Sequence, residues 1–375
     1  KSISILGTMF VDSLKAIAPV LVAVLVVSSV ARADGSMGKR FKTVITLYLL
    51  TTFLAAVVAV IASILFPVTL DLKEVEAKTD LVSLSDVFSN FFTNMVTNPF
   101  QSVASANYMG VLFWSILVGF GVKLKASTKT IEVIKDFSEV ISQVVGWVIQ
   151  FAPLGIMGLV FTSVAESGLH IFTEYGRLLL QLVGCMLCVS FVLNPLLVAF
   201  YLHRNPYPLI FKCMKESGLN AFFTRSSAAN IPVNMALCKK LGLDEDFYSV
   251  SIPLGSTINM DGAAVTITVF SLAVAHTVGI EVSFMSAIFL SFIATLGACG
   301  ASGVAGGSLL LIPMACSFFG ISDDAAMQAV AIGFIISVVQ DSVETALNST
   351  GDVVFTATAE MAETMKKAAG RTLGC

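Results

Sequence analysis

The chain has 375 residues, of which 56% are hydrophobic and 13% are charged, with a formal net charge of -3 and a mean hydropathy of +0.88. A soluble domain carries about a quarter charged residues, so this composition excludes one, and the mild charge gives no sign of nucleic-acid binding. Several stretches without Asp, Glu, Lys or Arg are long enough for a membrane-spanning helix of about 20 residues. They cover residues 43–70, 87–122, 140–165, 178–202 and 282–322. The sequence therefore predicts an all-α polytopic membrane protein, since a β-barrel would show alternating strands of about 10 residues.

The predicted elements follow in chain order. Continuous apolar segments predict helices over residues 5–30, 44–66, 131–164 and 178–201, with a broken helical stretch over 87–122. Further along, segments rich in Ser, Gly, Ala and Asn alternate with apolar helices: the first kind covers 209–236 and 284–315, the second 247–275 and 325–360. Because the chain opens at Lys1 and an apolar segment follows at once, we expect a further N-terminal segment to precede it.

The charged connections predict the orientation in the membrane. Connections 31–42, 123–135 and 203–215 and the C-terminal tail are basic, whereas residues 68–86 hold five acids against two lysines. Basic connections face the cytoplasm by the positive-inside rule. We therefore expect Lys1 on the outer side, which is consistent with one preceding helix.

Five charged residues interrupt the apolar segments beyond residue 220, namely Arg225, Asp261, Asp341, Glu344 and Asp352. A charge at the centre of a membrane helix costs about 2.5–3.5 kcal/mol, so the set indicates a functional site. An alternative is that some lie at helix ends or that Arg225 neutralises one acid. Four acids and one arginine sum to -3. A buried cluster of that charge needs cations, and its oxygen ligands favour alkali or alkaline-earth ions or protons.

The last predicted helix carries most of these charges on one side. At about 100° per residue, Asp341, Glu344, Thr345, Asn348 and Asp352 form a single stripe, which predicts a face turned toward a partner or a cavity rather than lipid.

Three segments contain poor helix formers inside apolar stretches. GSTINMDG (255–262) predicts a helix that unwinds and frees carbonyls to line a cavity or hold an ion. TRSSAAN (224–230) and GACGASGVAGGS (297–308) predict two re-entrant hairpins, whose tips present backbone N–H groups to an anion. Paired interruptions of this kind are typical of inverted-repeat transporters. A kink or close helix packing by small residues is the alternative for each.

Other functions have weaker support. Cys185 and Cys188 form a C-x-x-C pair inside an apolar helix, where packing explains them better than redox or zinc chemistry. Gly300–Gly303 reads G-x-S-G, as in intramembrane proteases, but no histidine is well placed to act as a base. A passive ion channel could use the same polar cavity, so this alternative stays open. We expect no enzyme.

TRSS, NMDG, GASGVAGG and the pattern DxxxTxxNxxGD together resemble the sodium:dicarboxylate symporter family of glutamate transporters and their prokaryotic relatives. FFTRSSAANIPVNMAL and QDSxETALNSxxD are similar to the bacterial sodium/serine-threonine symporter branch. The resemblance runs from the second transmembrane helix of that fold onward, with its first helix absent. It implies a homotrimer in the cell inner membrane, whose transport domains move like elevators.

The resemblance also implies how the chain divides. A scaffold helix and loop (1–43) precede a transport-domain helix (44–67). Trimerisation helices with one peripheral transport-domain helix (68–203) follow, and then the transport-domain core (204–375) with hairpin 1, a broken helix, hairpin 2 and the last helix.

Site residues carry over motif by motif. In the substrate site Asp341 would bind the substrate amine. Asn348 and the backbone around Ser226 and Ser227 would bind its carboxylate. The other implied substrate contacts are Glu344, Thr345, Met260, Ala263 and Val304. Three sodium sites are implied. Asp352, Gly255, Asn259 and Asn348 form the first; Thr257, Ala298, Cys299 and Ala301 form the second; and Thr51, Thr52, Asn259 and Asp261 form the third.

Departures from the family pattern predict the substrate. Glu344 stands where members for acidic substrates have an arginine, and Ala263 where they have a threonine. Ala305 replaces a usual proline in hairpin 2. A buried carboxylate repels an acidic side chain but accepts a hydrogen bond from a hydroxyl, and alanine would leave it unpaired. We therefore expect sodium-coupled import of L-serine and L-threonine. A sodium- or proton-coupled symporter for acidic amino acids or dicarboxylates is the alternative.

Overall fold

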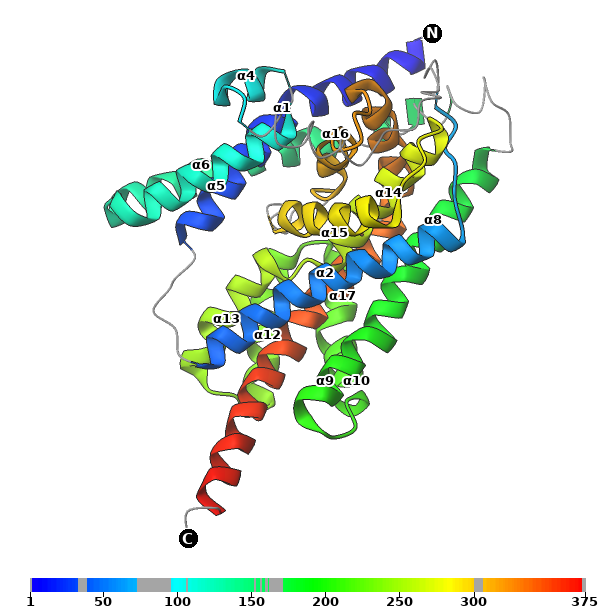
Figure 1. Ribbon diagram of the computed structural model, residues 1–375. Coiled ribbons are helices and arrows are strands. Elements are labelled where there is room, and N and C mark those ends of the chain that lie inside the picture. Colours follow the sequence, from blue (N-terminus) through cyan, green and yellow to red (C-terminus); the bar gives the residue numbers. More distant parts are fainter. Residues whose placement is uncertain are drawn as a thin grey trace.

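The computed structural model describes residues 2–32, 39–72, 96–105, 107–151, 153–155, 157–158, 161, 171–299 and 306–372, and all regular secondary structure in them is helical (Figure 1). The helices before residue 205 are α1 (Ser2–Arg32), α2 (Lys39–Leu65), α4 (Pro99–Ala104), α5 (Tyr108–Lys125), α6 (Thr128–Gln150), α8 (Ile171–Cys188), the π-helical η1 (Val189–Leu193) and α9 (Asn194–Leu202). Those after it are α10 (Tyr207–Cys213), the π-helical η2 (Met214–Gly218), α11 (Leu219–Thr224), α12 (Ser227–Lys240), α13 (Glu245–Ile258), α14 (Asp261–Thr277), α15 (Phe284–Ala298), the 3-10 helix η3 (Leu309–Leu311), α16 (Ile312–Ser317) and α17 (Asp323–Thr372).

Five helical segments in the described residues are long and apolar enough to cross a membrane: Arg40–Leu65, Thr128–Gly155, Tyr175–Leu202, Ser251–Thr277 and Asp323–Met365. They confirm the prediction of a multi-pass, all-α membrane protein. The predicted end of the last helix at residue 360 was wrong, because α17 continues to Thr372.

The helices pack in two groups. Helix α1 packs against α5 and α6, and Figure 1 shows these three together on one side of the molecule. The other group surrounds α14 and α17: α2 packs against α14, α15 and α17, and α8 against α2, α14 and α17. Helix α17 runs through this second group, and its C-terminal end projects away from the N-terminus (Figure 1).

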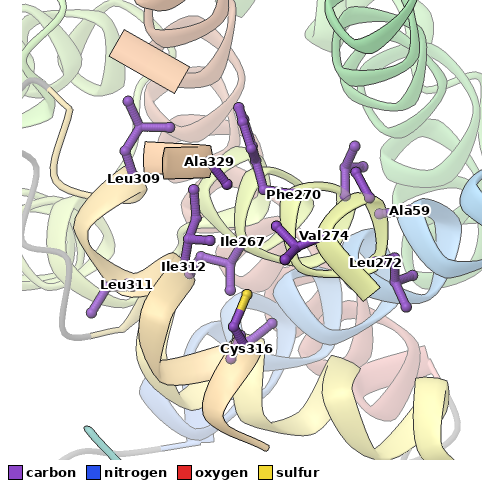
Figure 2. Packing of buried hydrophobic residues seen from close by; sticks show 14 of the residues in the cluster. Ala59, Ile267, Phe270, Leu272, Val274, Leu309, Leu311, Ile312, Cys316 and Ala329 are labelled. Carbon is purple, nitrogen blue, oxygen red and sulfur yellow. The ribbon is translucent and has the colours of Figure 1, made fainter. Parts of the chain in front are cut away.

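Helix α14 is the centre of the apolar core. Every residue from Asp261 to Ala275 is buried. A helix with an apolar surface all round is stable only when other elements cover it on every side. Figure 2 shows Ile267 and Phe270 of α14 among Leu309, Ile312 and Ala329. The polar residues of α14 are therefore held away from both water and lipid.

Two predicted interruptions occur where the sequence placed them. Helix α13 ends at Ile258 and α14 begins at Asp261, so the unwinding of GSTINMDG is confined to two residues. Helices α11 and α12 are separated at Arg225, which adopts a left-handed conformation (φ 49) that is rare outside glycine. The third interruption, after α15, falls largely on residues 300–305, outside the described part of the chain.

Candidate functional site

The polar stripe predicted on the last helix lies on α17 and is buried throughout. Its members are Asp341, Glu344, Thr345, Asn348 and Asp352. Three neighbouring elements reach this stripe: the start of α14, the segment that begins at residue 306, and the unwound residues between α13 and α14. The stripe therefore faces protein, as the helical spacing predicted.

Glu344 accepts three hydrogen bonds at one carboxylate oxygen. Thr266 Oγ1 donates to Glu344 Oε2 at 2.7 Å, Ser308 Oγ at 2.9 Å and Gln340 Nε2 at 2.6 Å. With Oε2 saturated, Oε1 is the carboxylate oxygen left to accept a hydrogen bond from a ligand. Sequence reasoning missed these three donors, although Gln340 lies one helical turn before Glu344 in an apolar helix.

Asp341 lies one turn of α17 away from Glu344. Its Oδ1 accepts a hydrogen bond from the backbone N–H of Gly306 at 3.3 Å. Thr345 is occupied within its own helix, because its Oγ1 donates to the Asp341 carbonyl at 2.8 Å. In the described part of the chain no ion pair within 4.0 Å joins Arg225 to Asp341 or Glu344, so the structure does not bear out direct neutralisation by this arginine.

Asn348 connects the stripe to the start of α14. Its Oδ1 accepts a hydrogen bond from the Gly262 N–H at 2.8 Å, and its Nδ2 lies 3.5 Å from the sulfur of Met260. Gly262 packs directly on α17, since a Cβ there would lie 2.9 Å from the Glu344 Cα. The adjacent Ala263 is buried. A thioether is a weak acceptor, so the Asn348 amide keeps donor capacity for a ligand carboxylate.

Asp352 lies about one turn beyond Asn348 along α17, beside the unwound segment. Asn259 Nδ2 donates to Asp352 Oδ1 at 3.0 Å and to the Asn348 carbonyl at 3.1 Å. Asn234 Nδ2 lies 3.5 Å from Oδ2. A Cβ at Gly255 would stand 2.8 Å from Oδ1, so only glycine allows this approach. The structure thus gathers the four residues predicted for the first sodium site.

Asp261 lies opposite two threonines of α2. Thr52 Oγ1 donates to Asp261 Oδ1 at 3.2 Å, and Thr51 Oγ1 lies 3.4 Å from Asn259 Oδ1. The four residues predicted for the third sodium site therefore lie together. Sequence reasoning missed Asn194 of α9, whose Nδ2 approaches Asp261 Oδ2 at 3.4 Å.

The residues predicted for the second sodium site are only partly gathered. Cys299 Sγ lies 3.5 Å from the carbonyl of Ile258, the neighbour of Thr257, so the end of α15 meets the end of α13. Ala298 is buried at the same helix end. Ala301 lies outside the described residues.

The predicted carboxylate-binding serines lie at the junction of α11 and α12, and both helices pack against α17. Ser227 is buried and Ser226 is half-buried. A network through Asn230 and Asn234 connects this junction to the carbonyl of Ser349. The substrate roles of the two serines stay predictions, and Val304 lies outside the described residues.

The family model of the sodium:dicarboxylate symporter family matches residues 1–361. The chain belongs to this family. It is 60% identical over 356 residues to a serine/threonine transporter, SstT, of Bifidobacterium adolescentis, a match that covers 94% of this chain and 83% of that protein. It is 52% identical over 369 residues to a protein of the same name from Streptococcus agalactiae serotype Ia, covering 98% and 91%. These matches confirm the resemblance indicated by the sequence motifs.

The symporter's polar centre has the donor set of a hard cation. The carboxylates of Asp261 and Asp352 lie beside the Thr52 hydroxyl, the side-chain amide of Asn259 and the Asn348 carbonyl. Carboxylate, hydroxyl and carbonyl oxygens are ligands that suit alkali and alkaline-earth ions. Within the described residues no three His, Cys, Asp or Glu side chains gather closely enough to hold a metal ion by themselves. The six described cysteines are free, and Cys185 is buried whereas Cys188 is exposed.

Proposed function

We propose that the protein is a sodium-coupled symporter that imports L-serine and L-threonine across the cell inner membrane. The observation that carries the proposal is the buried Glu344, whose Oε1 is left to accept a hydrogen bond. A hydroxyl can donate to this oxygen, whereas a substrate carboxylate would be repelled. The relatives named serine/threonine transporters support the same substrates.

The substrate would lie between α17 and hairpin 1. Asp341 would bind the ammonium group in place of its present bond to Gly306, and Glu344 the hydroxyl. The carboxylate would bind to Asn348 Nδ2 and to the backbone N–H groups around Ser226 and Ser227 at the start of α12, where a helix dipole favours an anion. The remaining implied contacts are Thr345, Met260, Ala263 and Val304.

Sodium would bind at the three predicted places. Asp352 with nearby carbonyls and Asp261 with the threonines of α2 supply anionic oxygens, while the ends of α13 and α15 supply carbonyls. Each ion that neutralises a buried carboxylate makes the closed site less costly to form. Each sodium that crosses down about 100 mV contributes about 2.3 kcal/mol, so even one ion per cycle supports substantial accumulation.

An elevator movement within a homotrimer is part of the proposal. Residues 1–43 and 68–203 would supply the scaffold, apart from the peripheral helix α8–α9, and residues 44–67 and 204–375 the transport domain. The packing of α1 with α5 and α6, and of α2 and α8 with α14 and α17, supports this division. Two re-entrant hairpins, over residues 209–236 and 284–315, would close the site from opposite sides.

Uptake by proteoliposomes tests the proposal. Labelled L-serine is presented with and without an inward sodium gradient, in competition with L-threonine or L-aspartate. We expect sodium-dependent accumulation that threonine blocks and aspartate does not. Block by aspartate would overturn the substrate, and a conductance without accumulation would indicate a channel.

A further inference from the structure

Asn194 is a buried polar residue within the membrane-crossing segment Tyr175–Leu202. It begins α9, directly after the π-helical segment η1, and only 4% of its surface is exposed. It is absent from the ligand sets that the motifs predict. Because an amide is costly to bury in a membrane helix, its position calls for a polar partner.

The two ends of the Asn194 amide differ in their surroundings. Nδ2 lies 3.4 Å from Asp261 Oδ2, a long hydrogen bond. Oδ1 is buried and accepts no hydrogen bond from the described residues. A buried acceptor left without a hydrogen bond is unfavourable. A cation beside Asp261 would give this oxygen a partner once the amide turned it toward the carboxylate, because the NH2 group now occupies that side.

Asp261 is held between two elements. Thr52 of α2 donates to Oδ1 at 3.2 Å, while Asn194 approaches Oδ2 from the other side. Thr51, the neighbour of Thr52, has its Oγ1 3.4 Å from Asn259 Oδ1. Asn194 therefore adds a fourth element, α9, to a group of oxygens contributed so far by α2, the unwound segment and the start of α14.

The local backbone explains why this asparagine points inward. In η1 the chain makes wider turns, which inserts one extra residue and rotates the positions that follow. Pro195 comes next and cannot donate a backbone hydrogen bond. The Phe191 carbonyl instead accepts a hydrogen bond from the Tyr207 hydroxyl at 3.2 Å. Such π-helical segments occur often at functional sites.

We propose that Asn194 belongs to the cation site of Asp261 and supplies its amide oxygen as a ligand for sodium. A half-turn of the amide about its last side-chain bond exchanges Nδ2 and Oδ1, and brings the oxygen toward the ion. Asn194 thereby contributes to sodium affinity without contacting the amino acid. The inference rests on the proposed sodium coupling.

The test measures sodium binding on the full chain in detergent, without amino acid. The thermal unfolding midpoint is followed as NaCl replaces choline chloride, and sodium-dependent serine uptake is measured in parallel. Asn194→Leu is expected to raise the sodium concentration for half-maximal stabilisation about tenfold or more, as loss of groups around a metal commonly does. The serine KM at saturating sodium stays within about threefold of the wild type, which a general packing defect would not give.

Matched variants keep the test decisive. Gln181→Leu is the matched control. It removes an amide from α8, in the same membrane-crossing segment, but this amide donates to Ser63 and to the Phe66 carbonyl. The variant is expected to keep the wild-type sodium dependence. Should Asn194→Leu not fold, Asn194→Ser lacks the reach of the amide and carries the same expectation. If a folded Asn194 variant needs the same sodium concentration as the wild type for half-maximal stabilisation, this inference is overturned but the proposed function is not. Absence of any sodium effect on the wild type overturns the proposed function as well.

Discussion

Replacement of Glu344 by glutamine tests how the symporter recognises a hydroxyl. The change keeps the shape of the side chain but removes its charge. Three donors already point at Glu344 Oε2, so the glutamine must turn its carbonyl oxygen toward them and its NH2 group toward the substrate. In the proposed site the substrate hydroxyl would then meet a neutral donor instead of a charged acceptor.

The expected magnitude follows from the lost charge. A hydrogen bond to a charged group contributes about 1.5–3 kcal/mol, and one between neutral groups about 0.5–1.5 kcal/mol. The midpoints of these ranges differ by about 1.3 kcal/mol, close to a factor of ten in affinity. We therefore expect the preference of Glu344→Gln for serine over alanine to fall about tenfold.

Competition of labelled serine uptake by unlabelled serine and alanine measures this preference. Glu360→Gln is the control: it removes a carboxylate from the same helix that bonds to the Asp244 N–H, far along α17 from the polar centre. An unchanged serine-to-alanine ratio in folded Glu344→Gln would refute recognition of the hydroxyl by this carboxylate.

Three further predictions use the same contacts. Glu344→Arg shifts the preference toward L-aspartate, because a guanidinium attracts the side-chain carboxylate that Glu344 repels. Gln340 can turn its unpaired Oε1 to accept a hydrogen bond from the new arginine. Unchanged competition by aspartate contradicts this reasoning. Gly262→Ala lowers the free energy of unfolding by about 1–3 kcal/mol, since the new methyl group overlaps the α17 backbone, and thermal unfolding checks it. Arg40→Ala lowers the free energy of unfolding by no more than about 1 kcal/mol despite the 2.7 Å ion pair with Asp244, because the two side chains are 32% and 40% exposed. Unfolding measured at low and high choline chloride checks this, since salt screens an exposed ion pair.

The sequence could predict the stripe on α17 because one period describes a single straight helix. It also located the break before Asp261, since Gly, Asn and Asp are unusual together in an apolar span. The end of α17 was misjudged because it was assigned by hydropathy. Residues 361–372 are polar but rich in Ala, Glu, Lys and Met, which favour a helix in water as well.

The donors to Glu344 could not be predicted, for a physical reason. A Thr or Ser in an apolar helix usually bonds to a carbonyl of its own preceding turn. Ser271 of α14 does so with Ile267, whereas Thr266 of the same helix turns to Glu344. Only the packing of α14 on α17 decides between these options. The π-helical η1, which orients Asn194, likewise has no compositional signature. The asparagine itself could have been noticed, because it stands beside a proline in an otherwise apolar stretch.

Asn259 lies between the two proposed carboxylate ion sites and the α17 turn of the proposed substrate site. Its Oδ1 lies near Thr51 in the Asp261 group, and its Nδ2 bonds both to Asp352 and to the Asn348 carbonyl. An ion at either carboxylate would therefore restrict this one side chain, and through it the α17 turn that carries Asn348. Because coupling between sites is reciprocal, serine must raise the affinity for sodium by the factor with which sodium raises that for serine. Asn259→Ala should reduce both factors together, whereas a loss confined to one ligand would show that the two sites communicate through another route.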